Sequence, residues 1–119
     1  MKLLFDHNVD RRFRRYIPGH EIRTTKEMGW ETLSNGVLLK SAADAGFEAF
    51  VSIDKKIEHE QNLKILPLTV IVIDALSNAL PTLIPFSPLL LDLLKQPVDP
   101  VLFVVEPTGR VHRLTASRK

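Results

Sequence analysis

Short apolar runs of strand length alternate along the chain with stretches whose apolar residues recur at helical spacing. The runs LLF, FVSI and TVIVI are nearly continuous, which is typical of strands buried on both faces of a parallel sheet. Their alternation with helical patterns predicts an α/β fold with right-handed crossovers. The strands expected in this part of the chain are Lys2–Phe5, Glu21–Thr24, Phe50–Ile53 and Val70–Ile73.

The first predicted helix follows the first strand. Val9, Phe13 and either Tyr16 or Ile17 recur at helical spacing, with arginines between them. The Pro-Gly pair that comes next ends this helix.

The second predicted helix begins at Ser34 or Asn35, either of which can cap its amino end. Gly46 ends it. Its expected apolar face consists of Val37, Leu38, Ala42 and Ala45.

Prolines interrupt the last third of the chain, which is less regular. One or two helices are expected there, with Ser87 and Pro88 as a helix start. The segments Val101–Glu106 and Arg110–Leu114 flank a Pro-Thr-Gly turn, which predicts a C-terminal hairpin or edge strand.

Composition bounds the class of protein. A length of 119 residues with 45% hydrophobic residues, no internal repeat and no long linker predicts a single domain over residues 1–119. The absence of cysteine excludes disulfides and thiolate metal sites and fits a reducing compartment. The apolar run at the N-terminus is too short for a signal peptide, and no stretch approaches the length of a membrane span. A soluble, cytoplasmic protein is therefore expected.

Positive charge is concentrated although the net charge is only +2. The segment RRFRRY holds four arginines, and Arg110, Arg113, Arg118 and Lys119 add charge near the C-terminus. This distribution is compatible with a polyanionic partner. A solvated basic helix face is the alternative.

Three acids follow predicted strands: Asp6, Asp54 and Asp74. Parallel strands bring their carboxyl ends to one sheet edge, where open α/β sheets bind ligands. Clustered carboxylates repel one another unless a cation or a proton relieves them, and their hard oxygens favour Mg²⁺ or Mn²⁺. Such ions assist phosphodiester hydrolysis. The alternative is that each Asp caps a helix or a turn.

The residues that follow these acids make Asp6 and Asp54 stronger site candidates than Asp74. Asp6 and Asp54 have polar neighbours (DHN and DKK), whereas Asp74 is followed by Ala-Leu. His7 and His59 are expected at the surface, and Met28 and Trp30 are expected in packing. Motifs of zincins, serine hydrolases, P-loop NTPases and dinucleotide-binding proteins are absent from the sequence.

Five segments, in this order and spacing, carry a family resemblance: LLFDHN, PGHEIRTTKEMGW, LSNGVLLKSA, FVSIDKKIEHEQN and LPLTVIVI. Together they resemble the DUF5615 group of PIN-like proteins, and they are similar to the Mut7-C end of that superfamily. The resemblance covers about residues 2 to 95. It implies a three-layer α/β/α sandwich and a metal-dependent ribonuclease, plausibly the toxin of a bacterial toxin–antitoxin pair.

The resemblance also implies site residues. Asp6 and Asp54 match the family's acids and would hold Mg²⁺ or Mn²⁺, with Asp74 as a third ligand. Asn35 stands where many relatives carry an Asp, and His7 where they often carry a Glu; Glu31 is a possible substitute acid. The residues implied to contact substrate are Asn8, Asn35, Lys55 and Lys56, with Arg11, Arg12, Arg14 and Arg15 guiding the RNA backbone.

Two departures from the family pattern, at His7 and Asn35, leave an alternative open. In this alternative the fold serves as a binding module for RNA or a partner protein, without catalysis. A third hypothesis is a phosphatase or other small phosphotransfer domain that uses the same sheet edge. Besides RNA, the expected partners are a cognate antitoxin and a second copy of the chain. The apolar segment LIPFSPLLLDLL offers a surface for a homodimer or, alternatively, forms an ordinary core helix.

Overall fold

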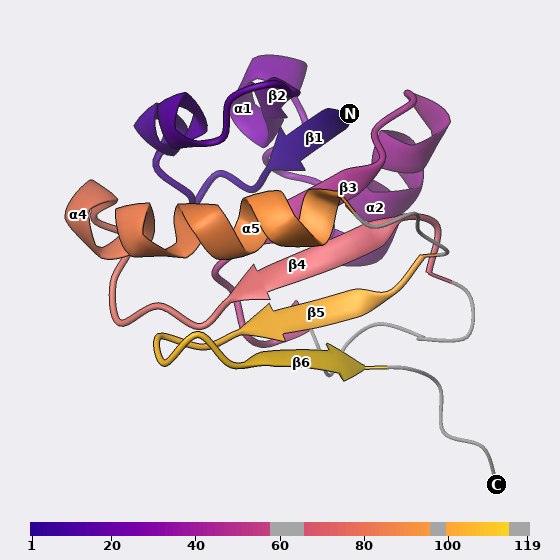
Figure 1. Ribbon diagram of the computed structural model, residues 1–119. Helices are drawn as coiled ribbons and strands as arrows, with labels where there is room; N and C mark the ends of the chain where they lie inside the picture. Colours follow the sequence, from indigo (N-terminus) through magenta and orange to yellow (C-terminus); the bar gives the residue numbers. More distant parts are fainter. Residues whose placement is uncertain (58–65, 96–99, 115–119) are drawn as a thin grey trace, which may run out of the picture.

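The computed structural model describes residues 1–57, 66–95 and 100–114 (Figure 1). His59, Arg118 and Lys119 lie outside the described residues. A six-stranded sheet runs through the molecule in the order β2-β1-β3-β4-β5-β6. All neighbouring strands from β2 to β5 pair in parallel, and β6 pairs antiparallel to β5. The strands are β1 (Lys2–Phe5), β2 (Glu21–Thr24), β3 (Ala49–Ser52), β4 (Thr69–Ile73), β5 (Leu102–Val105) and β6 (Val111–Leu114).

Helices cover both faces of this sheet, so the predicted three-layer α/β/α architecture is confirmed. Successive strand residues point to opposite faces. Leu3 and Phe5 of β1 therefore join one buried cluster, whereas Leu4 joins the other. Every residue of β3, β4 and β5 is buried, which explains why these strands read as continuous apolar runs.

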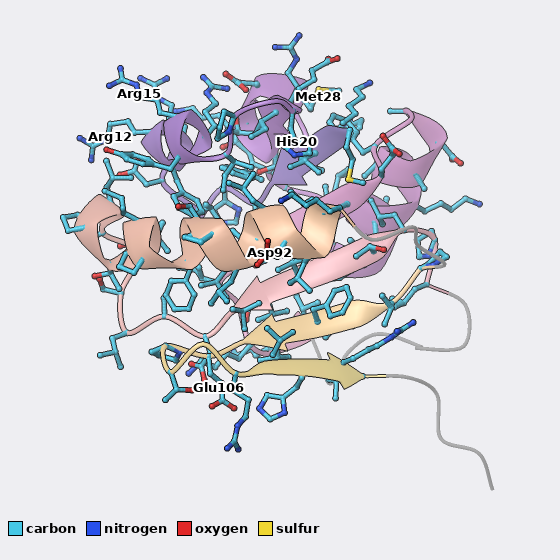
Figure 2. All side chains as sticks on the ribbon, in the orientation of Figure 1. Arg12, Arg15, His20, Met28, Asp92 and Glu106 are labelled. Atoms are coloured by element: carbon cyan, nitrogen blue, oxygen red, sulfur yellow. The ribbon has the colours of Figure 1, made fainter. Side chains whose placement is uncertain are left out.

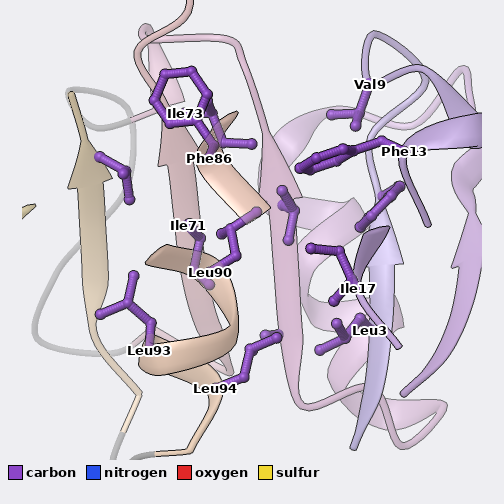
Figure 3. Close-up of a cluster of buried hydrophobic side chains, with 14 of the residues drawn as sticks. Leu3, Val9, Phe13, Ile17, Ile71, Ile73, Phe86, Leu90, Leu93 and Leu94 are labelled. Carbon is purple, nitrogen blue, oxygen red and sulfur yellow. The ribbon is translucent and has the colours of Figure 1, made fainter. Parts of the chain in front are cut away.

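One face is covered by η1 (Arg11–Tyr16), α4 (Leu80–Leu83), η2 (Ile84–Phe86) and α5 (Ser87–Leu94). Figure 3 shows the apolar side chains of these elements against the sheet. The predicted first helix is a 3₁₀-helix, in which Phe13 is buried between Val9 and Ile17. Tyr16 is 38% exposed, so Ile17 is the core residue of the two alternatives.

The helix start predicted at Ser87 and Pro88 is confirmed by α5. Leu90, Leu93 and Leu94 of this helix are buried against the sheet. The apolar segment LIPFSPLLLDLL thus includes a core helix, which is one of its two predicted roles.

The other face carries α2 (Asn35–Asp44), which begins after Ser34 as predicted. Its buried residues are Leu38, Leu39 and Ala42. The predicted apolar face was wrong at Val37, which is 52% exposed, and at Ala45, which is also exposed. Leu39 is buried in their place, so the buried face of α2 is rotated toward Leu39 and away from Val37. Gly46 follows the helix with φ +90°, a conformation that favours glycine.

The C-terminal strands form the predicted hairpin. The strand β5 is also the parallel neighbour of β4, so the hairpin extends the main sheet. Within residues 1–57, 66–95 and 100–114, no helix has the length and apolar character needed to span a bilayer.

Candidate functional site

The candidate site lies at the carboxyl ends of β1 and β3, the left-hand side toward which β1 points in Figure 1. The chain places β2 on one side of β1 and β3 on the other. This reversal is the switch point at which open α/β sheets bind ligands. Asp6 directly follows β1, and its backbone N–H donates to the Val51 carbonyl at 2.9 Å. Asp54 follows β3 by two residues.

A buried serine connects the two acids. The Ser52 Oγ donates a hydrogen bond to Asp6 Oδ2 at 2.8 Å and accepts one from the Asp54 backbone N–H at 3.0 Å. Ser52 is fully buried. Its hydroxyl therefore fixes the Asp6 carboxylate relative to the backbone that carries Asp54.

The Asp6 side chain is only 6% exposed, and a buried carboxylate needs hydrogen-bond partners. Its Oδ1 accepts the His7 backbone N–H at 2.8 Å and lies 3.0 Å from His7 Nδ1. The His7 side chain is 60% exposed, as expected from the sequence. His7 thus stands between the buried carboxylate and solvent.

Asp54 is half-buried, and its Oδ1 accepts the Lys56 backbone N–H at 3.0 Å. The turn-capping role that was the alternative for each acid therefore exists at Asp54. Capping with one oxygen is compatible with a ligand role for the same carboxylate, because each carboxylate offers about four acceptor positions.

A pocket of about 120 Å³ opens at this edge of the sheet. It brings together four of the predicted site residues, Asp6, Asn8, Asn35 and Asp54. Asn8 also accepts a long hydrogen bond, 3.5 Å, from the Ile53 backbone N–H. The remaining lining residues are His7, Thr25, Trp30, Glu31, Leu33 and Leu38.

Two other predicted residues pair with each other outside this pocket. Lys55 Nζ forms an ion pair with Asp74 Oδ1 at 2.5 Å, and neither residue lines the pocket. Asp74 lies at the same sheet edge, after β4, but on the side away from β1. Lys56 is exposed and contributes its backbone N–H to Asp54.

The arginines of η1 divide into two groups. Arg12 pairs with Asp10, N-terminal to the helix, and Arg14 pairs with Glu27. The Arg12 hydrogen bond lowers the pKa of Asp10, and Asp10 in turn raises the pKa of Arg12. Arg11 and Arg15 are exposed and have no ion pair with another described residue. Figure 2 shows Arg12 and Arg15 projecting outward at the upper left.

The donor set of the pocket suits one kind of metal binding. Among the described residues, no group of three or more His, Asp or Glu side chains is arranged to hold a metal ion. Mg²⁺, however, often keeps several waters and is bound through one or two carboxylates together with substrate phosphates. Asp6 and Asp54 supply hard oxygens to one pocket, so they fit a Mg²⁺ ion that is held by two carboxylates, with waters or substrate phosphates as its other ligands.

Three residues at the site were missed or given another role in the sequence analysis. Ser52 lies in the segment FVSIDKKIEHEQN, where the sequence gives it no role, and its central position follows from its place as the last residue of β3. Thr25 and Trp30 reach the pocket because β2 lies next to β1, which a linear pattern does not reveal. Trp30 has the expected packing role too, since its ring contacts Phe47 edge-on.

The fold and the pocket define an α/β domain with two carboxylates at the switch point of its parallel sheet. Comparison of the chain with models of known families, with curated proteins and with solved structures found no match. The resemblance to PIN-like proteins stays a prediction.

Proposed function

We propose that the protein is a metal-dependent endoribonuclease of the PIN-like type. The observation that carries this proposal is the pocket that Asp6 and Asp54 line together, with Ser52 linking them. The position supports it as well, because ligands of open α/β sheets bind at this switch point.

Asp6 and Asp54 would hold Mg²⁺ or Mn²⁺ in this pocket. When bound, such an ion activates water and offsets the negative charge of a phosphodiester undergoing hydrolysis. Ser52 keeps the Asp6 carboxylate in place, and Asn8 and Asn35 line the pocket, where their side chains would contact the substrate or ordered water. These residues thus act by positioning the metal-binding carboxylate and by hydrogen bonding.

The exposed arginines of η1 would guide the RNA backbone to the pocket. Arg11 and Arg15 lie on the helix that follows the Asp6 loop, so their charge is close to the site along the chain. Contacts of this kind bind phosphates without reading sequence and weaken as salt is added.

A second candidate is a binding module that has the same pocket and does not cleave. Asn35 favours it, because this amide lines the pocket where relatives of the resembled family carry an acid. An amide is a weaker ligand for a hard cation than a carboxylate and cannot act as a base. Such a module would bind RNA or a partner protein.

The test is cleavage of a single-stranded RNA with and without Mn²⁺, using the wild type, Asp6→Asn and Asp54→Asn. The matched control is Asp92→Asn, which makes the same change on the exposed side of α5. Cleavage by the wild type and by Asp92→Asn, lost in both pocket variants, is the expected result. Equal cleavage by all four proteins contradicts the mechanism. Wild-type RNA binding without cleavage favours the binding module.

A further inference from the structure

A buried hydroxyl at the pocket has no partner. Thr25 is fully buried, and its Oγ1 makes no hydrogen bond with any described residue. Thr25 is the first residue of α1 (Thr25–Met28), and it lines the pocket that also contains Asp6 and Asp54. Because buried polar groups are normally hydrogen-bonded, a hydroxyl left unsatisfied beside a pocket points to a ligand or a water that satisfies it.

The amino end of α2 lies at the same pocket. Asn35, its first residue, and Leu38, in its first turn, both line it. The Ser34 side chain at the N-cap makes no capping hydrogen bond, and the Leu38 N–H donates to the Ser34 carbonyl at 2.8 Å. With ten residues, α2 has a helix dipole whose positive end favours an anion at this position.

The pocket therefore combines two kinds of wall. Acidic side chains come from Asp6, Asp54 and Glu31, whereas α1 contributes the Thr25 hydroxyl and α2 the positive end of its dipole. An anion alone would be repelled by the carboxylates, whereas an anion together with a divalent cation would satisfy both walls. The volume of about 120 Å³ is several times the roughly 30 Å³ that one water occupies in the liquid. It admits a phosphate group.

We propose that this pocket binds one phosphate group of the RNA backbone, held by the Thr25 hydroxyl and favoured by the positive end of the α2 dipole, beside the cation held by Asp6 and Asp54. The inference rests on the proposed function, because it assigns the substrate-contacting residues of that same site. Thr25 is a phosphate-binding residue that the family resemblance did not supply. Its hydroxyl donates to a phosphate oxygen and carries no information about the base.

The experiment measures binding of inorganic phosphate to the full chain by calorimetry in the presence of saturating Mg²⁺. The variants are Thr25→Val, which removes the hydroxyl with little change of shape, and Thr25→Ser, which keeps it. Thr25→Val should bind phosphate about tenfold more weakly than the wild type, while Thr25→Ser stays within about threefold, since one hydrogen bond to a charged group is lost. The affinity for Mg²⁺ should be equal in all three proteins.

A second measurement separates binding from structure. The melting temperature of unliganded Thr25→Val should equal or exceed that of the wild type, because the variant removes an unsatisfied buried hydroxyl. The stabilisation by phosphate should then be smaller in the variant. If Thr25→Val does not fold, Thr25→Ala is measured with the same expectations.

Two results overturn the proposal: no phosphate binding by the wild type, or equal phosphate affinity of wild type and Thr25→Val. A hydroxyl with only a structural role would lower the unliganded melting temperature when removed and leave phosphate affinity unchanged. Phosphate binding that depends on Thr25, in a protein that does not cleave RNA, would support this inference and contradict only the proposed nuclease. A 5′-phosphorylated RNA that binds no better than inorganic phosphate would indicate a small phosphoester as the ligand.

Discussion

The Ser52 hydroxyl is the smallest feature on which the site depends. It donates to one acid and accepts from the backbone of the other, and it does so while fully buried. Hydrogen bonds to charged groups contribute more than neutral ones, and outer partners of a ligating carboxylate orient it for the metal. Ser52 is therefore a positioning residue for Asp6 and Asp54.

Replacing Ser52 with Ala should lower both stability and metal affinity. The expected loss is about 1.5–3 kcal/mol in the free energy of unfolding, because the Asp6 carboxylate loses a buried partner. The affinity for Mn²⁺ should fall by about tenfold or more. Urea denaturation and calorimetric titration measure the two effects, with Ser41→Ala on α2 as the matched control. Unchanged Mn²⁺ affinity in Ser52→Ala would remove the positioning role.

At the scale of elements, strands were predicted well and short helices poorly. The strand predictions agree with the structure to within one residue at each end. For the buried parallel strands the reason is their continuous apolar runs. The four-residue α1 was not predicted, since it is too short for an apolar position to recur at the helical period of 3.6 residues. Its signal was nevertheless present in the sequence: Thr24 and Glu27 form a capping box.

That capping box carries a testable pH dependence. The Arg14 side-chain hydrogen bond, followed by the Thr24 backbone N–H, lowers the pKa of Glu27 below its ordinary value of 4.5. A lowered carboxylate pKa stabilises the fold above the ordinary value, and this stabilisation is lost as the pH falls through the lowered pKa.

Glu27→Gln should therefore be less stable than the wild type at pH 7, by about 0.5 kcal/mol, because the pair is about one-third exposed and screened by water. The difference should vanish once the solution is acid enough to protonate Glu27. Denaturation at pH 7 and in acid measures it, with Asp44→Asn as a control of equal charge change. A difference that persists in acid would show that the charge of Glu27 is not its cause.

The strand pattern predicted the site only where it follows strand ends, whereas Asn35 was predicted by the family resemblance alone. Asp6 and Asp54 could be placed at one edge because each follows a strand, and Asn8 accompanies Asp6 in the same loop. The partners of these acids could not be placed without the strand order. The neighbourhood of β2, β1 and β3 brings Thr25 and Trp30 to the pocket, whereas β4 carries Asp74 to Lys55.

At the scale of the whole molecule, charge is distributed unevenly. The exposed arginines of η1 lie at the end of the molecule that carries the pocket, whereas Arg110 and Arg113 belong to the C-terminal hairpin at the opposite edge of the sheet (Figures 1 and 2). The two groups contribute equally to net charge, so they allow a matched comparison.

Removing the charge of Arg11 and Arg15 together should weaken RNA binding and its dependence on salt. Each phosphate contact to a single strand contributes about 0.7 to the slope of log K against log salt, so the slope should fall by about 1.4. The double variant Arg110→Ala, Arg113→Ala should change the slope less. Fluorescence anisotropy at several salt concentrations measures both. If the slope of log K against log salt were equal in the two double variants, the RNA would be attracted by the net charge of the protein and not by Arg11 and Arg15 in particular.

The central claim is that Asp6 and Asp54 form one metal site, and it can be observed directly. A crystal of the protein soaked in Mn²⁺ would give anomalous scattering at the position of the ion. We expect a peak in the pocket within about 2.0–2.3 Å of an oxygen of each carboxylate, close to the distances at which hard cations bind oxygen. The peak should be absent from Asp6→Asn. A soaked wild-type crystal with no peak between Asp6 and Asp54 would contradict the account.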